Sequence, residues 1–158
     1  MKRALGILLV LVGVLVPSVA LAAAPTKAGY IAKADPICRA VDSKLLVVDT
    51  GLVSEPVSAT PAFLVKVVDA LQRTSSFDQA ALKQLRAIPK PRGSVTLLTK
   101  LWNKLAEGIQ QAQEAIAAIE ATNTTELAQI SVAEIASEAQ YRKLAHRYGF
   151  KVCGATKA

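Results

Sequence analysis

The sequence predicts an all-α protein, an up-down-up-down four-helix bundle closed by one disulfide and preceded by a signal peptide. Apolar residues recur at steps of three and four through four segments, which are separated by breaks containing Pro, Gly or Thr. Alanine, leucine and valine are abundant and aromatic residues make up only 4%, a composition that suits packed helices better than sheets. The only two cysteines stand near the two ends of this pattern.

The first residues have the organisation of a signal peptide. Lys2 and Arg3 form a short positive region, and the uncharged, apolar run 5–16 follows. Pro17 then ends the apolar helix, because it has no N–H to donate and its ring crowds the preceding turn. We therefore expect the chain to be exported, to the cell envelope or the medium.

Small residues before Ala23 predict signal-peptidase cleavage between Ala22 and Ala23, and a cut after Ala24 is disfavoured because proline would follow it. An uncleaved anchor is the alternative, which Pro17 and the small residues argue against. The predicted division is 1–22 as signal peptide and 23–158 as one helical domain. This domain contains no further apolar segment of membrane-spanning length and no cysteine placed for a lipid anchor.

The first helix is expected over residues 28–50, followed by a loop over residues 51–60. Pro36 leaves two options: a helix that begins near residue 28 and is disturbed at Pro36, which we favour, or one that Asp35 caps, with Pro36 in its first turn. Its inward stripe comprises Ala34, Cys38, Val41, Leu45 and Val48.

The second helix should begin with Thr60 as N-cap and Pro61 at the first position, and should end at the two prolines within residues 88–93. Ser94 can cap the third helix. The third helix has the most regular apolar stripe: Val95, Leu98, Trp102, Leu105, Ile109, Ala112, Ile116 and Ile119.

Asn123 and Glu126 have the spacing of a capping box for a fourth helix over residues 124–148. Gly149 is expected to be the left-handed residue beyond its end, and Phe150 the accompanying apolar contact. The stripe of this helix drifts along Leu127, Ile130, Ile135, Ala139 and Leu144.

Cys38 and Cys153 are expected to form a disulfide, since exported thiols are normally oxidised and only one pairing exists. The topology supports this pairing. In an up-down-up-down bundle the start of the first helix and the end of the fourth lie at the same end of the molecule.

Three segments resemble a group of small exported helical proteins of high-GC Gram-positive bacteria: residues 30–39 (YIAKADPICR), 85–93 (LRAIPKPRG) and 148–154 (YGFKVCG). Many of those proteins carry a lipid-anchor cysteine, which this chain lacks, and usually have a small helix-forming residue where Pro36 stands. The group has no established activity, so the resemblance implies location and shape only.

No residue pattern predicts catalysis, a metal site or a cofactor. His146 is the only histidine, and its place among cations in the last helical turn is typical of a surface residue that interacts with the helix dipole. Asp35, Asp42 and Asp49 repeat every seven residues and could form a cation-binding stripe. The matching repeat of cations on the second helix instead favours salt bridges of Asp49 with Lys66 and of Asp42 with Arg73.

Charge is distributed unevenly between the two halves of the predicted bundle. The half that contains the chain termini, here called the basic end, comprises residues 23–40, 77–106 and 140–158. It holds 14 basic and 2 acidic residues, whereas the opposite half holds 3 basic and 10 acidic residues. On the third helix Lys100 and Lys104 stand near the start, against the helix dipole, so helix stability does not explain the pattern. Six of the seven aromatic residues (Tyr30, Phe77, Trp102, Tyr141, Tyr148 and Phe150) also fall in the basic end.

These observations favour a non-enzymatic exported bundle whose basic end contacts an anionic envelope polymer, a lipid headgroup or an acidic protein. The candidate contact residues are Lys83, Arg86, Lys90, Arg92, Lys100, Lys104, Arg142 and Arg147. The alternative is a carrier of a small anionic amphiphile in an aromatic pocket between the helices, with Lys100, Lys104 or Arg142 at its head group. Export argues against a nucleic-acid partner.

Overall fold

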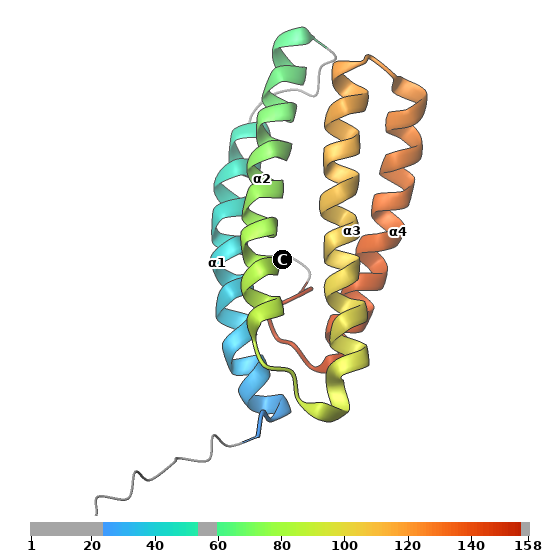
Figure 1. The fold of residues 1–158 in the computed structure, drawn as a ribbon. Coiled ribbons are helices and arrows are strands. Elements are labelled where there is room, and N and C mark those ends of the chain that lie inside the picture. The colour runs from blue at the N-terminus through green and yellow to red at the C-terminus, as the bar shows by residue number, and fades with distance from the viewer. Residues whose placement is uncertain (1–23, 54–59, 156–158) are drawn as a thin grey trace, which may run out of the picture.

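The computed structural model describes residues 24–53 and 60–155, and only the backbone of residues 49–53. It contains α1 (Lys27–Val53), α2 (Pro61–Ala87), the short 3-10 helix η1 (Arg92–Ser94), α3 (Val95–Glu120) and α4 (Thr124–Tyr148). Figure 1 shows the four long helices running in alternating directions. The predicted four-helix architecture is confirmed. The predicted signal peptide and its cleavage site lie outside the described residues.

The predicted beginnings of α2 and α4 are confirmed by their capping bonds. The Thr60 hydroxyl accepts a hydrogen bond from the Phe63 N–H at 3.4 Å. The side chain of Asn123 accepts from the Glu126 N–H at 3.2 Å and donates to the Glu126 carboxylate at 2.8 Å, which completes the capping box. None of the described helices is long and apolar enough to cross a membrane.

Two helix boundaries differ from the prediction. α1 continues through Pro36 and past Gly51 to Val53, so the loop begins later than expected. A glycine lowers helix propensity by about 1 kcal/mol but, unlike proline, keeps its N–H for the helical ladder. At the start of α3 the Ser94 side chain makes no capping bond; its N–H instead donates to the Pro91 carbonyl at 2.8 Å in the 3-10 turn.

The inward stripe predicted for α4 is wrong in its middle. Ile135 is 69% exposed and Ala139 is also exposed, whereas Ser137 is buried and Tyr141 is half-buried. The buried face of α4 includes Ile130 and Ser137, which are seven residues, or about two turns, apart. Ile135 lies on a different side of the helix.

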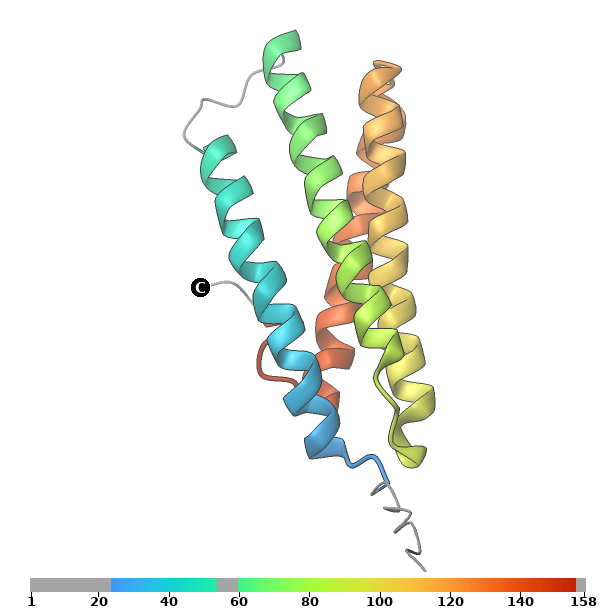
Figure 2. The same cartoon turned by 60° about the vertical axis from the view of Figure 1, so that its left-hand side comes forward.

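The helices pack in chain order, α1 on α2, α2 on α3 and α3 on α4, while α1 and α4 scarcely touch within the described residues. The chain beyond α4, residues 149–155, bridges these two helices; we call it the C-terminal tail. It turns back at Gly149, which has the left-handed conformation (φ 94°). Figure 2 shows the tail passing from the end of α4 towards α1. The predicted disulfide is present and links Cys38 of α1 to Cys153 of the tail, with their Cα atoms 5.2 Å apart.

The large side chains of the core gather at the basic end. Tyr30, Trp102, Tyr148 and Phe150 pack together with ring centroids 4.9–6.3 Å apart. The Trp102 indole N–H donates to the Tyr30 hydroxyl at 2.9 Å, and that hydroxyl donates to the Leu85 carbonyl at 3.1 Å. A smaller cluster of Ala115, Ala118 and Ile130 fills the other end.

Candidate functional site

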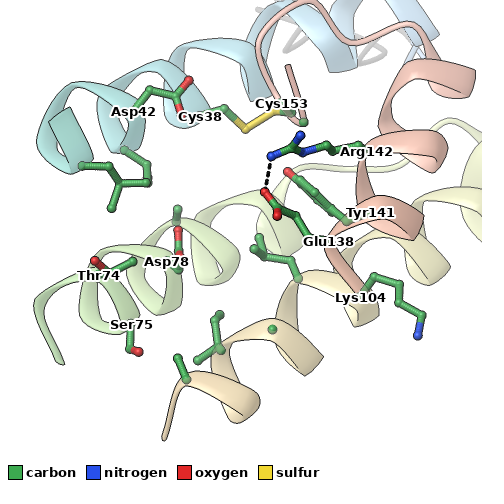
Figure 3. Close-up of a pocket in the computed structure, with 18 of the residues that line it drawn as sticks. Cys38, Asp42, Thr74, Ser75, Asp78, Lys104, Glu138, Tyr141, Arg142 and Cys153 are labelled. Atoms are coloured by element: carbon green, nitrogen blue, oxygen red, sulfur yellow. Dashed lines mark hydrogen bonds and ion pairs between the residues drawn. A yellow bond between two sulfur atoms is a disulfide. The ribbon is translucent and has the colours of Figure 1, made fainter. Parts of the chain in front are cut away.

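A groove of about 510 Å³ runs between α1 and α4, with α2 and α3 forming its floor. We call it the central groove, and Figure 3 shows its lining side chains. Its volume falls in the range of small-molecule sites, roughly 300–1,000 Å³. The apolar part of the lining includes Val41, Leu45, Leu71, Leu85, Leu105 and Ile109.

The C-terminal tail bridges α1 and α4 and closes one end of the groove. Residues 152–155 line the groove, and Cys153 joins them covalently to α1. The buried carboxylate of Asp35 accepts backbone N–H bonds from Lys151 and Val152 at 3.2 Å and from Cys153 at 3.4 Å. These contacts fix the tail, and with it that end of the groove, to α1.

Carboxylates outnumber cations in the lining. The four acidic residues are Asp42 of α1, Asp78 of α2, and Glu134 and Glu138 of α4; the two basic ones are Lys104 and Arg142. Both cations already bond to glutamates. Lys104 contacts Glu107 at 2.6 Å, and Arg142 pairs with Glu138, as Figure 3 shows. The groove therefore has the opposite sign of charge from the basic end, although it extends into that end at Lys104 and Arg142.

The titrating groups of the groove reflect this negative field. Burial raises the pKa of Tyr141 well above its usual value, and the carboxylates of Asp78, Asp42 and Asp35 raise it further. Partial burial also raises the pKa of Glu134, with a contribution from the Glu138 carboxylate. Both side chains are therefore harder to deprotonate in the groove than in water.

Ser75 of α2 lines the groove, is only 5% exposed, and its hydroxyl has no hydrogen-bond partner among the described residues. A buried polar group without a partner typically costs about 1–3 kcal/mol. Within the same described residues, no three His, Cys, Asp or Glu side chains are placed to hold a metal ion.

The aromatic pocket that the sequence suggested does not form in the described part of the chain. Tyr30, Trp102, Tyr148 and Phe150 are buried in the core, where their rings pack on one another instead of lining a pocket. Tyr141 is the one aromatic residue of the described groove lining.

The candidate cations of the basic end occupy three places. Lys83, Arg86, Arg92 and Arg147 are exposed, and Lys90 is half-buried. A second, more open hollow of about 450 Å³ lies between α3 and α4, lined by Lys100, Asn103, Lys104, Gln140, Lys143 and Leu144. We call it the lysine hollow. Arg142 faces the central groove instead.

Of the two salt bridges predicted between α1 and α2, the described residues give an outcome only for Arg73. Arg73 pairs with Asp69, four residues earlier on the same helix, at 2.9 Å. Neighbours one turn apart on a helix meet without any tertiary constraint, which favours this local pair. The Asp49 side chain, the expected partner of Lys66, lies outside the described residues. His146 is exposed, as expected for the last turn of α4.

Neither the role of Asp35 nor the acidic character of the central groove is predicted by the sequence patterns above. Asp35 stands three residues before Cys38, on the same face of α1, so a disulfide to the tail brings the tail backbone near its carboxylate. That spacing was the available signal. No protein family, no curated protein and no solved structure matches this chain.

Proposed function

We propose that the protein is an exported, non-enzymatic helical bundle whose basic end contacts anionic groups of the cell envelope. Phosphate or carboxylate groups of an envelope polymer, lipid headgroups or an acidic protein would all present the required chemistry. The Cys38–Cys153 disulfide supports export, since disulfides persist in oxidising compartments.

The observation that carries the proposal is where the two acidic side chains of the basic end lie. Asp35 is buried beneath the C-terminal tail, and Asp78 lines the central groove. Neither carboxylate is exposed, whereas most of the lysines and arginines described in this end are. Such a positively charged surface attracts anionic partners and steers their approach.

The lysine hollow is the best-defined contact point on this surface. It combines the ammonium groups of Lys100 and Lys143 with the side-chain amides of Asn103 and Gln140. Ammonium and amide N–H groups both donate hydrogen bonds to phosphate or carboxylate oxygens. Lys104 contributes less, because it already pairs with Glu107.

Co-sedimentation with vesicles that contain phosphatidylglycerol tests the proposal. Replacing Lys100→Gln and Lys143→Gln together should weaken binding, since each lysine at an anionic surface contributes about 1 kcal/mol, or about fivefold in affinity. Added salt should produce a similar loss, because exposed charges are screened over about 10 Å at about 0.1 M.

A matched control changes net charge by the same amount in the opposite half. Gln113 of α3 and Gln129 of α4 are exposed there, and Gln113→Glu with Gln129→Glu lowers the charge by two, as the lysine pair does. Binding should be nearly unchanged in this control. Equal losses of vesicle binding in both variants would show that only the net charge of the protein matters. Unchanged binding by the lysine variant would exclude the lysine hollow as the contact point.

A further inference from the structure

The central groove adjoins the lysine hollow, because Lys104 lines both, but its chemistry is different. Its floor and much of its walls are aliphatic, from α1, α2 and α3. Its polar groups are mainly carboxylates placed on three helices, and they do not converge on one centre. An apolar channel with separated acidic groups suits an organic molecule better than a bare ion.

We propose that the central groove binds a small cationic amphiphile, a molecule that joins a protonated amine to an apolar body. The apolar body would lie against Leu71, Leu105 and Ile109 on the floor of the groove. The amine would lie near the acidic side chains of α2 and α4.

Charge selects the amine over an anionic head group. Asp42, Asp78, Glu134 and Glu138 face the groove, and both of its cations, Lys104 and Arg142, already bond to glutamates. An anionic head would enter beside an excess of carboxylates, which would repel it. An ammonium group would reduce the repulsion among them.

The net charge of the protein makes the choice of probe informative. Because the chain is strongly basic overall, with a formal charge of +7, non-specific attraction favours anionic amphiphiles. n-Decylammonium and n-decanoate have the same alkyl chain and opposite charges. A preference for the ammonium must therefore come from a local site.

Calorimetric titration with both probes, below their micelle concentrations, tests the proposal. n-Decylammonium should bind at least about tenfold more tightly than n-decanoate. Glu134→Gln should weaken n-decylammonium by about three- to tenfold, because it removes one carboxylate of the groove. The matched control is Glu120→Gln, which removes an exposed carboxylate of α3 outside the groove and should change the affinity less than twofold.

Gly108 of α3 offers a test that does not depend on charge. It lines the groove, and a Cβ added there would meet no atom within 4 Å. Gly108→Leu should fill the groove and lower the affinity for n-decylammonium at least tenfold. Gly108→Ala should retain most of that affinity. Thermal melting of both variants verifies that they fold. Binding that survives Gly108→Leu, tighter binding of n-decanoate, or no binding of n-decylammonium would each overturn the proposal.

Discussion

The carboxylate of Asp35 accepts a hydrogen bond from the backbone N–H of Cys153 at 3.4 Å. Asp35 lies about one helical turn before Cys38, and Cys38 forms the disulfide with Cys153. The Asp35 carboxylate also accepts from the N–H groups of Lys151 and Val152. A covalent bond and a buried carboxylate thus secure the same short segment. Because α1 and α4 scarcely touch within the described residues, this attachment links the first helix to the end of the chain.

Asp35→Asn should destabilise the protein by about 1–3 kcal/mol, since an amide has one acceptor oxygen where the carboxylate has two and loses the charge that strengthens the bonds. Urea unfolding measures the change. Asp69→Asn is the control: that exposed carboxylate pairs with Arg73 on its own helix, and its loss should cost under about 1 kcal/mol. Equal effects of the two substitutions would contradict a special role for Asp35.

The disulfide should contribute more than any other single contact. It joins residues 115 apart in sequence, and the chain-entropy treatment assigns a loop of that length roughly 4–5 kcal/mol. Replacing Cys38 and Cys153 together with serine should lower the melting temperature accordingly. The Asp35→Asn change should then cost less than in the oxidised protein, because both restrain one segment. Two thiols freely alkylated in the native protein would exclude the bond.

The architecture was predictable because its signals are local. Thr60 and Asn123 cap helices through bonds to residues three positions away, and Gly149 ends α4 within its own turn. Cys38 and Cys153 had only one pairing. The residues that determine each helix end lie close together in the sequence, and the two cysteines allow only one disulfide.

The candidate site was not predictable in the same way. The central groove brings together side chains of four helices and the tail, and its acidic lining depends on which side of each helix faces inward. On α4 the sequence pattern placed Ile135 inside, whereas this side chain is 69% exposed. Weak amphipathicity leaves the rotation of a helix to tertiary packing, which one sequence does not reveal.

Export has a direct chemical test. Mass spectrometry of the secreted protein should show a chain that begins at Ala23, because small residues precede the expected cleavage position. A start at Ala24 would shift the cut by one residue only, whereas a start at Pro25 would require cleavage directly before a proline. A product that retains Met1 and sediments with membranes would contradict the signal-peptide prediction.

Gly154→Ala should destabilise the fold by about 1–3 kcal/mol. Gly154 has φ +73°, a conformation that residues with a Cβ rarely adopt, and an added Cβ would lie 2.7 Å from the Ala145 Cβ. The tail would have to move away from α4. Gly108→Ala is the matched control, since its Cβ meets nothing and alanine favours helix by up to about 1 kcal/mol. A neutral Gly154→Ala would show that the tail tolerates displacement.

Tyr141 should make the stability of the protein depend on alkaline pH. Burial, followed by the carboxylates of Asp78, Asp42 and Asp35, raises the pKa of its phenol in the folded protein. Unfolding restores the usual pKa of about 10, so the unfolded chain loses the proton first as the pH rises. The stability that the protonated phenol provides is complete below about pH 10 and is lost progressively above it.

Tyr141→Phe isolates this effect, because lysines and the other tyrosines titrate in both proteins. The substitution removes the hydroxyl and keeps the ring, so the variant should melt close to wild type at pH 7. Above about pH 10 wild type should lose stability faster, and by ultraviolet absorbance wild type should have one more tyrosine than the variant that ionises only on unfolding. Tyr30→Phe is the contrast: it removes the bonds to Leu85 and Trp102 and should lower stability already at neutral pH. Parallel alkaline melting curves for wild type and Tyr141→Phe would contradict a raised pKa at this position.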